Sequence, residues 1–202
     1  MPQTSTPLDS RIIANAVLDR ARAISRPITN LDIQKIVYFM HGHYLVRHEA
    51  PLVRGEFEAW PYGPVHRVLY NAFREYENKP IDRLAMAFDP ITRTSRSLPA
   101  LADDGAVAVL GDFLGHYLDL PTYLLVELTH GVGTPWSRTM EDARSRVNVG
   151  MRIADSTIRI FFEGLSLSSG SKRQSTDGQR LRKTKEDSRP ESGRFAWKIP
   201  CD

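Results

Sequence analysis

The stretch from Thr29 to Tyr44 constrains the fold of this chain more than any other, because it is apolar on almost every side. Thr29 and Asp32 have the spacing of a capping box, which predicts a helix of about four turns. Its apolar positions are Leu31, Ile33, Ile36, Val37, Phe39, Met40 and Tyr44. Such a helix must be covered all round, so we expect it at the centre of the domain, interrupted only by Gln34 and Lys35.

Other segments repeat apolar residues at the three-and-four spacing of a helix with one buried face. The first predicted helix follows a cap at Asp9 or Ser10 and ends at Pro27, and a later one follows Asp103 and Asp104. Two more are predicted, one from Pro121 to Thr129 and one after a cap at Asp155. We interpret the fold class as mainly α: a compact helical domain with a small β element.

The β element is predicted around residues 53–60, where Phe57 and Ala59 alternate with glutamates as in a half-exposed strand. The run Trp60-Pro-Tyr-Gly-Pro64 predicts a tight turn that ends it. Pro64 suits the first position of a helix, so a third helix is expected from there to Phe73. Leu84 to Phe88 is predicted to form either a second strand or an irregular cover over the core.

Charge divides the chain into two parts. Of its 202 residues, 1–165 hold 18 Lys and Arg against 19 Asp and Glu, a net charge of −1, whereas 166–202 hold 9 against 5, a net of +4. We therefore predict a globular domain over 1–165 and a disordered basic tail over 166–202, too poor in apolar residues to fold. Within this tail, Phe195 to Ile199 is richer in apolar residues. We expect it to be either a short docking segment or an unselected end of the chain.

Composition also bears on compartment and chemistry. The most apolar region, 107–132, contains several charged residues and predicts no membrane span. Residues 1–7 have neither the basic start nor the apolar core of a secretory signal, so a cytoplasmic protein is expected. Cys201 is the sole cysteine, which excludes an internal disulfide and a cysteine-built zinc site.

The sequence gives little support to an enzymatic function. His41 and His43 are two residues apart, which places them on different faces of a helix, whereas zinc enzymes pair histidines four apart. We find no nucleophile elbow, phosphate-binding loop or dinucleotide fingerprint in the sequence. We therefore expect no catalysis, no cofactor and no metal. His130, before a Gly-Pro turn, is expected either to end a helix or to bind backbone or a partner.

Two segments carry a resemblance to a known family. The first is Ile28-Thr-Asn-Leu-Asp-Ile-Gln-Lys-Ile-Val-Tyr-Phe39, and the second is Phe57-Glu-Ala-Trp-Pro-Tyr-Gly-Pro-Val65. A weaker match is Thr129-His130 followed by Pro135-Trp136. Together they resemble the Panacea-domain family of antitoxin-like proteins, over about residues 10–163. The family often has a lysine where this chain has Asp32.

The resemblance implies an antitoxin that binds and neutralises a cognate protein toxin, either directly or as a proteolytic adaptor that delivers the toxin to an ATP-dependent protease. It implies these partner-binding residues: Gln34, Lys35, Tyr38, Trp60, Tyr62, His130 and Trp136. Trp60 is expected to be either a buried anchor or a partner contact. Gly63 and Pro64 are expected to make the turn, and Gln34 and Lys35 to be either surface groups or buried polar groups with partners.

An alternative function is a DNA-binding regulator of the chain's own operon. The net charge of −1 over residues 1–165 argues against it, as does the absence from the sequence of a helix-turn-helix pair with a basic recognition helix. Nucleic-acid binding by the folded part is therefore not expected, although the basic tail can attract polyanions non-specifically.

Overall fold

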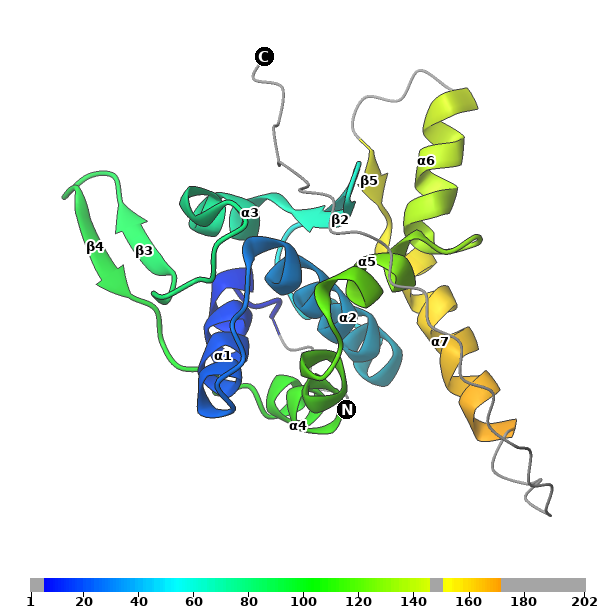
Figure 1. The fold of residues 1–202 in the computed structure, drawn as a ribbon, viewed down its shortest axis with the longest axis horizontal. Coiled ribbons are helices and arrows are strands. Elements are labelled where there is room, and N and C mark those ends of the chain that lie inside the picture. Colours follow the sequence, from blue (N-terminus) through cyan, green and yellow to red (C-terminus); the bar gives the residue numbers. More distant parts are fainter. Residues whose placement is uncertain (1–5, 146–150, 172–202) are drawn as a thin grey trace, which may run out of the picture.

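The computed structural model describes residues 6–145 and 151–171, and it is mainly helical (Figure 1). Its helices are α1 (Ser10–Ala23), α2 (Asn30–His48), α3 (Arg67–Phe73), the single 3₁₀ turn η1 (Arg74–Tyr76), α4 (Asp104–Leu118), α5 (Thr122–His130), α6 (Pro135–Ser145) and α7 (Asp155–Ser171). Its strands are β1 (Phe57–Trp60), β2 (Gly63–His66), β3 (Met86–Asp89), β4 (Thr94–Ser97) and β5 (Arg152–Ile153). None of the helices in the described ranges is long and apolar enough to span a membrane.

Helix α2 occupies the centre of the molecule, as its sequence predicts. The capping box is present, with Thr29 Oγ1 accepting from the Asp32 amide and the Asp32 carboxylate accepting from the Thr29 amide. Helices α1, α4, α5 and α7 and strand β2 all pack on α2, so it is covered from several directions (Figure 1). Gly42 allows α7 to come close, because a Cβ at this position would overlap the ring of Phe162.

The main sheet has three antiparallel strands in the order β2-β1-β5. Phe57, on β1, is fully buried and lies opposite His66 on one side and Ile153 on the other. The strand at 57–60 was expected, whereas β5 is too short to leave a period in the sequence. The sheet therefore joins segments about 95 residues apart in the chain, a separation that local patterns do not report.

The prediction that Pro64 starts a helix is wrong. Pro64 lies in β2 opposite Ala59, and the helix begins only at Arg67. Proline at a helix start and proline in a hairpin strand share the same φ, so the local sequence favours either. Pairing with β1 decides between them, and it buries Val65 on the strand.

Three other segments differ from or refine the expectations. The predicted strand at 84–88 exists as β3, but Met86 and Phe88 are exposed, and the β3–β4 hairpin extends away from the helices (Figure 1). Helix α6 was not expected, because its sequence is largely polar. Helix α7 continues to Ser171, past the predicted domain boundary at 165. The rest of the predicted tail lies outside the described residues.

Candidate partner-binding face

The β1–β2 hairpin turn consists of Pro61 and Tyr62, between the paired residues Trp60 and Gly63. Gly63 has φ +97°, a backbone conformation that glycine adopts without strain. A Cβ on Gly63 would also lie 2.7 Å from Lys35 Nζ and 2.8 Å from Thr129 Oγ1. The turn therefore needs glycine for its conformation and for its close approach to α2 and α5, and the predicted turn-making role of Gly63 agrees with both observations.

Lys35 lies directly beneath this turn and is fully buried. Its ammonium donates a hydrogen bond to the Pro64 carbonyl oxygen at 3.0 Å, and it forms no ion pair with any of the described acidic residues. Burial lowers the pKa of Lys35 to about 7, because a charged ammonium is poorly solvated in the interior. Of the two expectations for Lys35, the structure shows the buried polar group with a partner.

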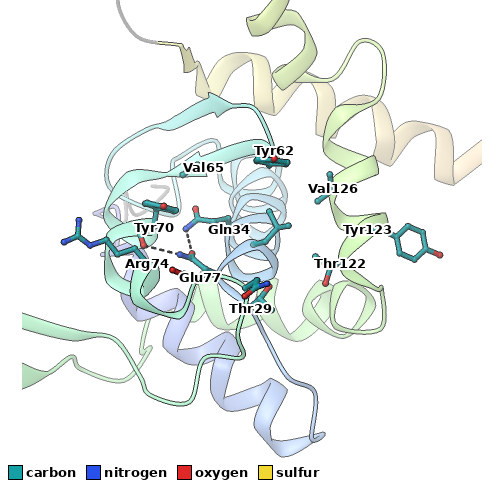
Figure 2. A pocket seen from close by; sticks show the side chains of 13 residues that line it. Thr29, Gln34, Tyr62, Val65, Tyr70, Arg74, Glu77, Thr122, Tyr123 and Val126 are labelled. Carbon is teal, nitrogen blue, oxygen red and sulfur yellow. Dashed lines mark hydrogen bonds between the residues drawn. The ribbon is translucent and has the colours of Figure 1, made fainter. Parts of the chain in front are cut away.

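The side-chain amide of Gln34, on α2, links this helix to β2. Its Oε1 accepts from the His66 amide at 2.8 Å, and its Nε2 donates to Asn30 Oδ1 at 3.3 Å. Asn30 Nδ2 in turn donates to the Tyr70 carbonyl at 3.3 Å (Figure 2). This chain of hydrogen bonds fixes β2 and α3 against the first half of α2.

Two tryptophans and a histidine connect the turn to α5 and α6. Trp136 Nε1 donates to the Trp60 carbonyl at 2.8 Å, and the His130 ring centroid lies 4.0 Å from that of Trp136. The ring nitrogens of His130 face the carbonyls of Val126 at 2.8 Å and Pro61 at 3.3 Å. Trp60 is half-buried, with Nε1 donating to Glu58 Oε2 at 2.8 Å. The structure thus brings Trp60, His130 and Trp136 together.

Tyr38 does not belong to this face. It is buried in the core, with its ring edge-on to Phe57 at 5.2 Å and to Phe39 at 5.8 Å. Lys35 and Tyr38 are therefore out of reach of a partner in this structure, whereas Gln34, also largely buried, lines the groove described below. Among the predicted partner-binding residues, Tyr62 is the most accessible, with 43 % of its surface exposed.

A groove of about 720 Å³ lies between the first turns of α2, the β2–α3–η1 segment and α5 (Figure 2). Its lining residues are Thr29, Asn30, Leu31, Gln34, Tyr62, Val65, Tyr70, Arg74, Glu77, Asn78, Thr122, Tyr123 and Val126. Val126 and Thr122 point into the groove, whereas the Tyr123 ring points away from it and is 68 % exposed (Figure 2).

The sequence analysis missed the α5 wall of this groove. Leu125 and Thr129 are the buried positions of α5, and Val126 lies at the edge of that stripe while Tyr123 lies off it. That Val126 and Leu31 line the same groove depends on how α5 packs on α2, which the sequence does not show.

The histidines considered for metal binding have separate partners. His41 Nε2 lies 3.0 Å from Asp155 Oδ1, whereas His43 Nε2 lies 2.8 Å from the Tyr117 hydroxyl. Burial, aided by the positive charges of Arg47 and His116, lowers the pKa of His43 to about 4. Within residues 6–145 and 151–171, no three His, Cys, Asp or Glu side chains are grouped to hold a metal ion.

Comparison with known proteins agrees with this architecture and its motifs. Residues 33–137, which include most of α2, the hairpin turn, α5 and Trp136, match the family model described as antitoxin SocA-like, Panacea domain. The chain is 34 % identical over 171 residues to Antitoxin SocA of Caulobacter vibrioides (strain NA1000 / CB15N), covering 83 % of this chain and 91 % of that relative. No solved structure matches. The chain belongs to the SocA-like antitoxin family with a Panacea domain.

Proposed function

We propose that this chain is an antitoxin that binds and neutralises a cognate protein toxin, without catalysis of its own. The observation that carries the proposal is the relationship to Antitoxin SocA, which extends over most of both chains. The matched region also contains the hairpin turn and every residue that lines the groove except Thr29, Asn30 and Leu31. The DNA-binding alternative lacks comparable support, since residues 1–165 carry a net charge of −1.

The groove and the hairpin turn beside it form the part of the described surface that is best suited to hold a protein partner. Tyr62 offers a large, rigid side chain with a polar edge, the type that contributes most to interface affinity. The neighbouring carbonyls of Trp60, Pro61 and Pro64 are held by contacts from Trp136, His130 and Lys35, so little conformational freedom is lost when a partner binds. The predicted residues at Gln34, Lys35, His130 and Trp136 thus act by presenting the turn.

The proposal is tested by co-expression with the product of the adjacent reading frame. The wild-type chain should restore growth of cells that express this toxin. Val126→Asp places a charge in the groove and should abolish the rescue. Leu128→Asp, on the same helix but outside the groove lining, is 47 % exposed as leucine and should rescue fully. A wild-type chain that fails to rescue contradicts the function, whereas equal rescue by both variants contradicts only the groove.

The route of neutralisation is resolved in the same cells. Direct inhibition leaves the amount of toxin unchanged while growth recovers. An adaptor lowers the amount of toxin, and the decrease disappears when the ATP-dependent protease is deleted. We propose that binding comes first in both routes, so Val126→Asp should abolish either one.

A further inference from the structure

The groove can accept an apolar ligand and, apart from Arg74, Glu77 and Asn78 in its lining, offers few groups to a polar one. Its floor contains four polar side chains whose groups are hydrogen-bonded within the domain. Gln34 binds the His66 amide and Asn30, Asn30 binds the Tyr70 carbonyl, and Thr29 and Thr122 both donate to Asp32. The walls of the groove are mainly apolar. A ligand that fills it must therefore bring apolar side chains.

The chain itself contains such a segment outside the described residues. Residues 172–194 contain no aromatic residue, and Leu181 is their one aliphatic residue. Apolar residues then reappear as Phe195, Trp197 and Ile199, separated by Ala196 and Lys198. In an extended segment, alternate residues lie on one face, so all three large apolar side chains would face the same way. We propose that Phe195–Ile199 docks into the groove of the same molecule.

The connection is long enough for this contact. About 24 residues separate Ser171 from Phe195, which corresponds to roughly 80 Å fully extended and to an average span of about 27 Å for a flexible chain. A domain of this size is about 40 Å across. Every point on its surface is therefore within reach, and a tether of this length gives an effective concentration on the order of 1 mM. Even a weak intrinsic affinity is then sufficient.

Charge favours the same pairing. Residues 1–165 carry a net charge of −1 and residues 166–202 a net of +4, so the two parts attract each other. At the edge of the groove Glu77 forms no ion pair with another described residue, and it lies beside Arg74 in η1. Lys198, within the proposed segment, carries the charge opposite to that of Glu77.

The unique cysteine allows a direct test on the full-length chain. Cys201 lies two residues after Ile199, so a benzophenone maleimide attached there reports where the segment binds. After illumination, crosslinks should concentrate on the segments 29–34, 62–78 and 122–126. Phe195→Ala with Trp197→Ala should reduce them at least tenfold, and so should Val126→Asp. Leu128→Asp should leave them unchanged.

Two outcomes would overturn the inference. Crosslinks spread evenly over the domain, insensitive to the aromatic substitutions, mean that the segment does not dock. In a mixture of isotopically heavy and light chains, crosslinks found mainly between chains mean that a second copy occupies the groove. The experiment contains no toxin, so its result is independent of the proposed function.

Discussion

The ammonium of Lys35 donates a hydrogen bond to the Pro64 carbonyl oxygen at 3.0 Å, and this bond ties the buried centre of α2 to the strand behind the hairpin turn. The two residues are 29 positions apart, and each belongs to one of the two segments that carry the family resemblance. The bond links the two segments physically: the first supplies the supporting lysine, and the second supplies the turn that this lysine supports.

The first prediction concerns the charge on Lys35. Its pKa is lowered to about 7 in the fold from about 10.5 in the unfolded chain. Between these values the unfolded chain binds more protons, so the free energy of unfolding should rise with pH, by at most about 1.4 kcal/mol per pH unit. The contribution is present above pH 10.5 and is lost as pH falls through about 7. Lys35→Met should remove this dependence.

Denaturant unfolding of both proteins between pH 7 and 10 measures the effect. The difference in free energy between wild type and Lys35→Met isolates Lys35 from other groups that titrate in this range. A difference that is constant across the range contradicts the assignment of a lowered pKa to Lys35.

The second prediction concerns Gly63. Gly63→Ala forces a side chain into a left-handed conformation and against Lys35 Nζ, so it should destabilise the fold by about 1–3 kcal/mol. Gly111→Ala is the matched control, because Gly111 lies within α4 with nothing within 4 Å of a built Cβ. That change should stabilise by up to about 1 kcal/mol. Thermal melting distinguishes them, and equal effects would refute the close approach at Gly63.

The third prediction concerns the bond between α6 and the turn. Trp136→Phe keeps an aromatic ring beside His130 but removes the indole donor to the Trp60 carbonyl. The fold should lose about 1–2 kcal/mol, because a half-buried acceptor is left without its partner. Urea unfolding measures the loss. Unchanged stability would mean that α6 does not hold the turn through this bond.

The fourth prediction concerns acid. Since the pKa of His43 is lowered to about 4 from 6.5, the unfolded chain binds the extra proton between these values. This part of the stability is present above pH 6.5 and is lost as pH falls through about 4. His43→Phe should reduce the acid sensitivity in that window, since phenylalanine can retain the stacking on Phe113. Melting temperatures from pH 4 to 7 provide the check; parallel curves for the two proteins would contradict it.

The parts of the fold that were predicted are those with local causes. The capping box at Thr29 and Asp32 and the continuous apolar run after it are enough to predict α2 from its local sequence. Pro64 shows the opposite case, because the same φ suits a helix start and a strand, and only pairing with Ala59 decides. Helix α6 is largely polar, and its packing rests on few apolar residues, such as Trp136 and Met140, four positions apart, which is too weak a signal to mark a helix by itself.

The candidate site divides in the same way. Trp60, Tyr62 and Trp136 can be singled out by residue type and by family resemblance, and the structure brings them to the same turn or into contact with it. Whether a polar residue on α2 supports a surface or forms it depends on packing, which buries Gln34 and Lys35. The Val126 wall depends on the placement of α5, which joins the site only through tertiary contacts.

The most direct test of the central claim is the affinity of the purified chain for the toxin encoded by the adjacent reading frame, measured by calorimetry on wild type, Tyr62→Ser and Leu128→Ser. Both positions are exposed to a similar degree, at 43 % and 47 %, but only Tyr62 lines the groove. We predict that Tyr62→Ser weakens binding by about 2 kcal/mol or more with a nearly unchanged melting temperature, while Leu128→Ser binds as wild type does. Full affinity in Tyr62→Ser, or no binding by the wild-type chain, would contradict the account.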